Sequence, residues 1–224
     1  MALPEVKIEN LFEPANSAFD AGDYQEAYDY FTEILAYDSE NYEAYLGKGL
    51  SAGWLSTIAQ NRIGEATRGF LKAISYSPED KKEEVIKRGL SLILDLISTY
   101  YKQLKAYVED ALLRVKGPFT NSRVRTDVIN DLGDTYYRRL RELVLELNEL
   151  SPLLPDSERI KSKKMIVFLC KEGINYKKLN PLQHERAFLR NLIEICDYEI
   201  KEYDLSCKLK EENPLEREKS IVNL

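Results

Sequence analysis

Histidines, cysteines and paired carboxylates are the side chains that most often catalyse reactions or bind metals. In this chain their number and spacing do not match known catalytic or metal-binding motifs. The 224 residues include one histidine, His184, whereas a zinc site of the H-E-x-x-H kind needs two on one helix face. The three cysteines, Cys170, Cys196 and Cys207, lie 26 and 11 residues apart and form no C-x-x-C pair. We therefore expect buried free thiols and no metal site.

Two pairs of carboxylates are the nearest candidates for general acid and base. Glu109 adjoins Asp110, and Glu142 lies four residues before Glu146, but all four fall on charged helix faces. Catalysis would require their burial and shifted pKa values. The ten glycines form neither G-x-G-x-x-G nor G-x-x-x-x-G-K-[ST], so no phosphate-holding loop is present. The sequence predicts a non-catalytic protein without a cofactor.

Aromatic rings stand beside cations in the run Tyr136-Tyr137-Arg138-Arg139, an arrangement that proteins binding single-stranded nucleic acid use. Most of the fifteen tyrosines, however, fall on apolar helical stripes, the net charge is −6 and no nucleic-acid-reading motif is present. Core packing is the favoured interpretation of these tyrosines. Association with nucleic acid is the less favoured alternative.

Charge is divided unevenly along the chain. Residues 1–43 carry eleven acidic side chains against Lys7 alone, and residues 114–141 carry seven basic side chains against three aspartates. Two interpretations stay open, namely two solvated helix surfaces of opposite sign or surfaces that attract partners. The most apolar run, residues 90–97, is far shorter than the roughly 20 residues of a membrane-spanning helix. With no secretory pattern at the start of the sequence, we expect a cytoplasmic protein.

The elements that position these side chains are organised around residues 15–78. Ala27 and Phe31 recur 39 residues later as Ala66 and Phe70, with small residues where two helices must touch and large ones beside them. This code resembles two tetratricopeptide repeats, which are helical hairpins with the pattern W-x2-L-G-x2-Y, then A-x3-F, then P. The run at residues 42–49 is also similar to bacterial tetratricopeptide proteins of unassigned function.

The resemblance covers roughly residues 9–80 and departs from the family pattern. Leu11 and Tyr45 stand where tryptophan is usual, Ser39 replaces a closing proline, and Ile34 replaces a small residue. About five extra residues precede the second helix of the second copy, as either an extra turn or a loop.

Every apolar pattern has a helical period and every breaker falls between such patterns, so the predicted fold is all-α. We expect TPR-like helical hairpins followed by long antiparallel helices in an α-α superhelix. The predicted regions are a repeat module at 1–80, a carboxy-terminal long-helix region packed on it at 81–207, and a charged, frayed tail at 208–224.

Turn and capping residues predict the helix ends. Asn10 with Glu13 forms a capping pair for the first helix, and Gly22 closes that helix. The longest helix should bridge the two halves and stop at the Gly117-Pro118 pair, and the last helix should start at Asn180-Pro181.

The tetratricopeptide resemblance also implies a groove for a peptide or helix of another protein. The family register places six residues there: Phe12, Asn16, Phe19, Leu46, Leu50 and Trp54. These are mainly apolar and lie in or beside the most acidic part of the chain, which predicts an adaptor for a net-basic, amphipathic segment. Packing of the same side chains against the longest helix is the alternative for these residues. The alternative function is a self-assembling scaffold, such as a homodimer.

Overall fold

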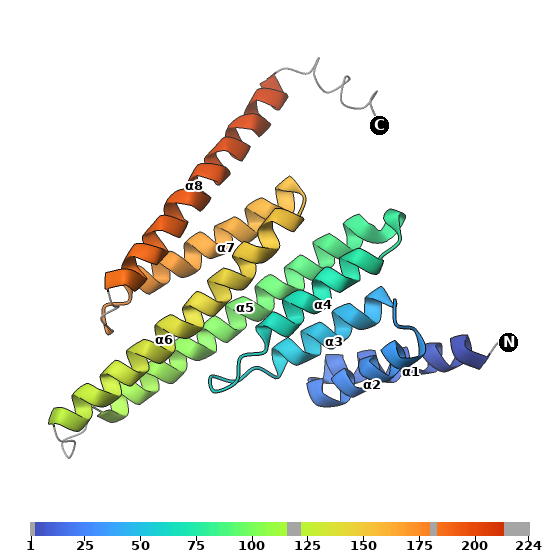
Figure 1. Cartoon of the computed structure of the whole chain (residues 1–224), viewed down its shortest axis with the longest axis horizontal. Coiled ribbons are helices and arrows are strands. Elements are labelled where there is room, and N and C mark those ends of the chain that lie inside the picture. The colour runs from blue at the N-terminus through green and yellow to red at the C-terminus, as the bar shows by residue number, and fades with distance from the viewer. Residues whose placement is uncertain (1–2, 116–121, 180–182, 213–224) are drawn as a thin grey trace.

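The computed structural model describes residues 3–115, 122–179 and 183–212 (Figure 1). Those residues form eight α-helices and one short 3-10 helix and contain no strand, which confirms the all-α prediction. The predicted helix boundaries at Gly117-Pro118 and Asn180-Pro181 lie outside them. In chain order the elements are α1 (Leu3–Ala21), α2 (Tyr24–Tyr37), α3 (Tyr42–Trp54), α4 (Ile63–Tyr76), α5 (Glu79–Val115), α6 (Ser122–Leu150), η1 (Ser151–Leu153), α7 (Asp156–Asn175) and α8 (Gln183–Glu212).

The first four helices form two hairpins with one packing pattern. Gly22 turns the chain between α1 and α2 with a φ of 83°, a conformation that favours glycine, as predicted. Ala27 of α2 and Ala66 of α4 are both fully buried where helices meet. The rings of Phe31 and Phe70 are buried beside them, so the predicted equivalence of the two copies is confirmed in the core.

The predicted start of the first helix is wrong, because α1 begins at Leu3 and continues through Pro14. Pro14 has no amide hydrogen to donate to the carbonyl of Asn10, so the helix loses one hydrogen bond there. Ile8 and Leu11 pack against the apolar cluster that α1 and α2 share. This packing stabilises the turns that precede the proline.

α5 joins the two halves of the molecule. Its 37 residues span roughly 55 Å at 1.5 Å per residue. It contacts α3 and α4 of the repeat module as well as α6 and α7 of the carboxy-terminal half (Figure 1). One continuous apolar cluster extends from Leu46 in α3 through α5 to Cys196 in α8. The predicted bridging role of this helix is confirmed.

The carboxy-terminal half is a stack of long helices in which α6 returns along α5, α7 packs on both, and α8 covers α7. Cys170 and Cys196 are buried and Cys207 is half-buried, and all three are free thiols. Burial raises the pKa of the Cys170 thiol to about 12. Among the helices that the structure describes, none has the length and apolar character needed to cross a membrane.

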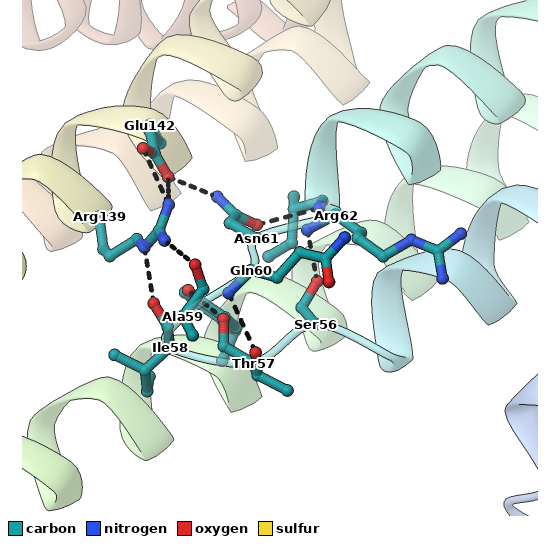
Figure 2. A network of polar contacts seen from close by, with 11 residues as sticks. Ser56, Thr57, Ile58, Ala59, Gln60, Asn61, Arg62, Arg139 and Glu142 are labelled. Atoms are coloured by element: carbon teal, nitrogen blue, oxygen red, sulfur yellow. Dashed lines mark hydrogen bonds and ion pairs between the residues drawn. The ribbon is translucent and has the colours of Figure 1, made fainter.

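The extra residues of the second hairpin form a loop at residues 55–62, and α6 holds this loop (Figure 2). The guanidinium of Arg139 donates from Nε to the carbonyl of Ile58 at 3.0 Å and from Nη2 to that of Ala59 at 2.7 Å. Arg139 is only 9% exposed, so its guanidinium has little access to water as a substitute for these carbonyls. The insertion therefore attaches the carboxy-terminal half to the repeat module.

Candidate functional site

The carboxylates considered for catalysis have structural partners. Glu142 accepts a hydrogen bond from the Asn61 amide at 2.8 Å and forms an ion pair with Arg139 at 2.7 Å (Figure 2). Glu146 accepts a hydrogen bond from the hydroxyl of Thr67 in α4. These contacts use both carboxylates to join α6 to the second hairpin.

The remaining chemical candidates also have ordinary surroundings. Glu109 pairs with Lys178 at 3.1 Å, and Asp110 pairs with Arg114 at 2.7 Å. His184 is exposed, and its Nε2 lies 3.4 Å from a carboxylate oxygen of Glu185. Within the described ranges no three histidine, cysteine or acidic side chains gather as metal ligands would.

The run considered for nucleic-acid binding lies mostly in the core. Tyr136 is fully buried, Tyr137 is 5% exposed, and the two rings pack edge to face with centroids 5.1 Å apart. Arg139 binds the loop, which leaves Arg138 exposed. Core packing was therefore the correct interpretation of these tyrosines.

Two of the six predicted groove residues do not reach a surface. Leu46 and Leu50 of α3 are each 3% exposed and belong to the apolar cluster with α5. A Cβ built on Gly53, one turn beyond Leu50, would lie 2.4 Å from the side chain of Leu96 in α5. The expectation that these leucines line an open groove is corrected, because α5 covers this face of α3.

The other four predicted residues stay accessible. Asn16 is exposed, and Phe12, Phe19 and Trp54 are half-buried. Phe12 packs edge to face on Phe31, with ring centroids 6.4 Å apart. Phe19 packs against both apolar clusters of the molecule and thus lies where the first hairpin meets the second.

Three half-buried rings from α1, α2 and α3 form what we call the aromatic ladder, composed of Phe19, Tyr24 and Trp54. Phe19 meets Tyr24 edge to face at 5.4 Å, and Tyr24 stacks on Trp54 at 5.5 Å with an interplanar angle of 14°. The sequence prediction omitted Tyr24. Its place directly after the Gly22-Asp23 turn was the available signal, because that turn brings it back beside the end of α1.

Acidic side chains surround the first hairpin. Residues 8–43 contain ten carboxylates and no lysine or arginine, and nine of the ten are exposed while Asp38 is half-buried. None of them forms an ion pair with another residue that the structure describes. The charge of Glu26 raises the pKa of Tyr30 above its ordinary value, with a smaller contribution from Glu33. The first hairpin therefore presents a negative surface without ion pairs to the rest of the described chain.

A second surface, of opposite charge, was missed by the sequence prediction. A cleft of about 430 Å³, which we call the cationic cleft, lies between α2, α3 and α4. Its lining comprises Tyr28, Tyr45, Lys48, Gly49, Ala52, Glu65, Arg68, Gly69 and Lys72. Hydrogen bonds from Arg62 hold the pKa of Glu65 below its usual range, and the charges of Arg68 and Lys48 act in the same direction.

Comparison with known proteins gives no identity to this arrangement. No family model, curated protein or solved structure matches the chain.

Proposed function

We propose that this protein is a non-catalytic adaptor that binds a net-basic, amphipathic segment of another protein along its first hairpin. The observation that supports this proposal is the aromatic ladder within an acidic segment, residues 8–43, whose ten carboxylates form no ion pair in the described chain. The tetratricopeptide resemblance agrees with this function, because repeat hairpins provide surfaces for extended partners.

Rings and carboxylates contribute differently to such binding. Half-buried aromatic side chains offer apolar area and a preferred stacking geometry, so they supply affinity when a partner covers them. Asp20 follows Phe19 and Asp23 precedes Tyr24, which places acidic groups next to the ladder in the chain. Their charge attracts lysine and arginine side chains and mainly accelerates encounter.

The proposed contact set is smaller than the one expected from the sequence. Phe12, Asn16, Phe19 and Trp54 remain in it and Tyr24 joins them, whereas Leu46 and Leu50 stabilise the fold from within. An amphipathic helix lying along α1 would cover this surface without displacing α5.

The test starts from a partner recovered by pull-down and identified by mass spectrometry, then titrated against the full chain. Trp54 is the only tryptophan, so its fluorescence reports occupancy of the ladder directly. The double change Glu13→Lys with Asp20→Lys should slow association about tenfold at low salt, because both exposed carboxylates lie on α1.

A matched control removes the same charge elsewhere. The double change Glu149→Lys with Glu202→Lys alters two exposed carboxylates on α6 and α8 and should leave association within about twofold of the parent. If both double variants bind like the parent while changes on α6 to α8 abolish binding, the first hairpin is not the functional surface.

Self-assembly is the second candidate, and a specific observation favours it. Ile195, Tyr198 and Leu205 of α8 are 44%, 66% and 54% exposed. Their spacing of three and seven residues places them on one helical face. A light-scattering mass of twice 25.9 kDa that Tyr198→Glu returns to the monomer value would support this candidate.

A further inference from the structure

The cationic cleft exists because two helices meet with no side chain between them. A Cβ on Gly69 would lie 2.7 Å from the carbonyl oxygen of Tyr45 and 2.8 Å from the Cα of Gly49. The backbones of α3 and α4 therefore touch at this crossing. Ala52 is the neighbouring lining residue on α3, so nothing large rises from the floor and the cleft stays open.

Three cations line the cleft without a carboxylate partner. Lys48, Arg68 and Lys72 form no ion pair with any residue that the structure describes. The acidic lining residue, Glu65, is engaged by Arg62 through two hydrogen bonds of 2.7 and 3.0 Å. A ligand entering the cleft therefore meets a net positive charge, because the lining carries three cations and the single carboxylate of Glu65.

Tyrosine rings hold two of these cations in place. The ammonium of Lys48 lies 5.0 Å from the ring centre of Tyr28, and that of Lys72 lies 4.7 Å from the ring centre of Tyr45. Such contacts restrict long side chains before a ligand arrives, so less side-chain entropy is lost on binding. The two lysine side chains are thus preorganised for an anionic ligand.

The acidic side chains near the cleft favour a short acidic peptide over a nucleic acid as its ligand. α2 forms one wall, and its exposed Glu26, Asp29 and Glu33 have no ion-pair partner in the described chain. A nucleic acid carries a charge at every nucleotide, so a strand extending beyond the cleft would meet these like charges. A short peptide can place its carboxylates only where the cations lie.

We propose that the cationic cleft binds a short acidic peptide segment of a partner protein. Its carboxylates pair with Lys48, Arg68 and Lys72, and an apolar side chain between them covers the floor at Gly49 and Gly69. This site lies across α2, α3 and α4, goes beyond the function proposed for the first hairpin, and gives the molecule two binding surfaces of opposite charge.

The test measures binding of a fluorescein-labelled, C-terminally amidated peptide, Gly-Asp-Leu-Glu-Asp-Gly, to the full chain at low salt, because its three carboxylates match the three lining cations. Arg68→Ala with Lys72→Ala should weaken binding at least about tenfold, because both side chains are exposed and their loss removes two of the three cations. Circular dichroism checks that the variant is folded. The control, Lys102→Ala with Lys164→Ala, removes two exposed cations from α5 and α7 and should leave binding within about twofold.

Four results would overturn the proposal. The first is no saturable binding of the peptide, and the second is an equal loss in the control, which indicates attraction to net charge alone. The third is a single-stranded oligothymidine that binds more tightly than the peptide and loses affinity in the same variant. The fourth is a dimer mass that Arg68→Ala with Lys72→Ala abolishes, which assigns the cleft to a second copy of the chain.

A further variant separates this site from the first hairpin. Glu13→Lys with Asp20→Lys should leave peptide binding intact while weakening the basic partner, because both carboxylates lie on α1, outside the cleft lining. Failure of one proposal can thus be recognised without failure of the other.

Discussion

The two hairpins of the repeat module share a core and differ in what they present to solvent. Residues of α4 follow their equivalents in α2 by 39 positions, which aligns Ala27 with Ala66 and Phe31 with Phe70, all of them buried. Alanine at these positions lets the helices approach, and phenylalanine fills the space beside the crossing. In both hairpins this geometry restricts which residue types fit at the interior positions.

One difference between the two copies lies at the floor of the cationic cleft. Tyr30 of α2 occupies the position that Gly69 holds in α4. Without a side chain there, α4 approaches α3 backbone to backbone and the surface above the crossing is hollow. The glycine at position 69 therefore permits the close crossing that forms the floor of the cleft.

Charge is inverted at the neighbouring exposed positions. Asp29 and Glu33 of α2 correspond to Arg68 and Lys72 of α4 under the same alignment. Exposed positions can exchange charge with little cost to the fold, so two copies of one hairpin can acquire different partners. Three predictions test this comparison, and one tests the carboxy-terminal core.

The largest expected effect concerns the contact that only the second hairpin makes with α6. Arg139→Leu should destabilise the protein by about 3 kcal/mol, because it leaves the carbonyls of Ile58 and Ala59 without their donor and removes the ion-pair partner of Glu142. Arg138→Leu, at the exposed neighbouring position, should change stability by less than about 0.5 kcal/mol. Urea unfolding compares the two, and equal effects would contradict a special role for Arg139.

The second prediction concerns the glycine crossing. Gly69→Ala should cost about 2 kcal/mol, because the new methyl group meets backbone atoms of α3 that cannot rotate away. Gly133→Ala is the matched control on α6, where a Cβ meets no atom within 4 Å, and it should stabilise by about 1 kcal/mol through helix propensity. Thermal unfolding that shifts in the same direction for both would reject the close crossing.

The fold could be predicted further than the site. Helical periodicity and breakers located the hairpins and the turn at Gly22, because these features depend on local sequence. The same apolar pattern at Leu46 and Leu50 suits an open groove or a covered one, and only the position of α5 decides between them.

The cationic cleft could not be predicted from helical pattern alone. Lys48 lies 20 residues before Arg68, and their proximity depends on how α3 crosses α4. Alignment of the two copies contained a usable signal, since glycine stands at position 69 where the first copy has tyrosine.

The third prediction concerns a buried tyrosine of the carboxy-terminal core, Tyr137. Burial raises the pKa of Tyr137 to about 12 from an ordinary value near 10. The folded state keeps the proton where the unfolded state loses it, so the contribution of this tyrosine to stability is complete below pH 10 and declines as pH rises to 12. At pH 11 the loss should be about 1.4 kcal/mol.

The variant Tyr137→Phe isolates this effect. It removes the hydrogen bond from the tyrosine hydroxyl to the Gly173 carbonyl at 3.3 Å, so it should be somewhat less stable than the parent at pH 8. Between pH 8 and pH 11 it should lose about 1.4 kcal/mol less than the parent in urea unfolding. An unchanged pH dependence would mean that Tyr137 ionises as readily in the fold as in the unfolded chain.

The smallest expected effect tests the charge inversion itself. Asp29 and Glu33 form a like-charge pair four residues apart on α2, as Arg68 and Lys72 do on α4, and such pairs weaken a helix slightly. Glu33→Lys replaces repulsion by attraction in the favourable order, with the acid before the base, and should stabilise by about 0.5 kcal/mol at low salt.

The equivalent change in the second hairpin should behave differently. Lys72→Glu also relieves repulsion, but it removes the cation from the ring of Tyr45, so the two effects should cancel to within about 0.5 kcal/mol. Melting temperatures at low and high salt check both variants, since salt should erase the gain from Glu33→Lys. A gain for Lys72→Glu as large as that for Glu33→Lys would mean that the tyrosine does not stabilise the cation. The Lys72 side chain would then not be preorganised for the acidic peptide proposed to bind the cationic cleft. A gain confined to Glu33→Lys would instead show that charge repulsion weakens the fold in the acidic hairpin and not in the second.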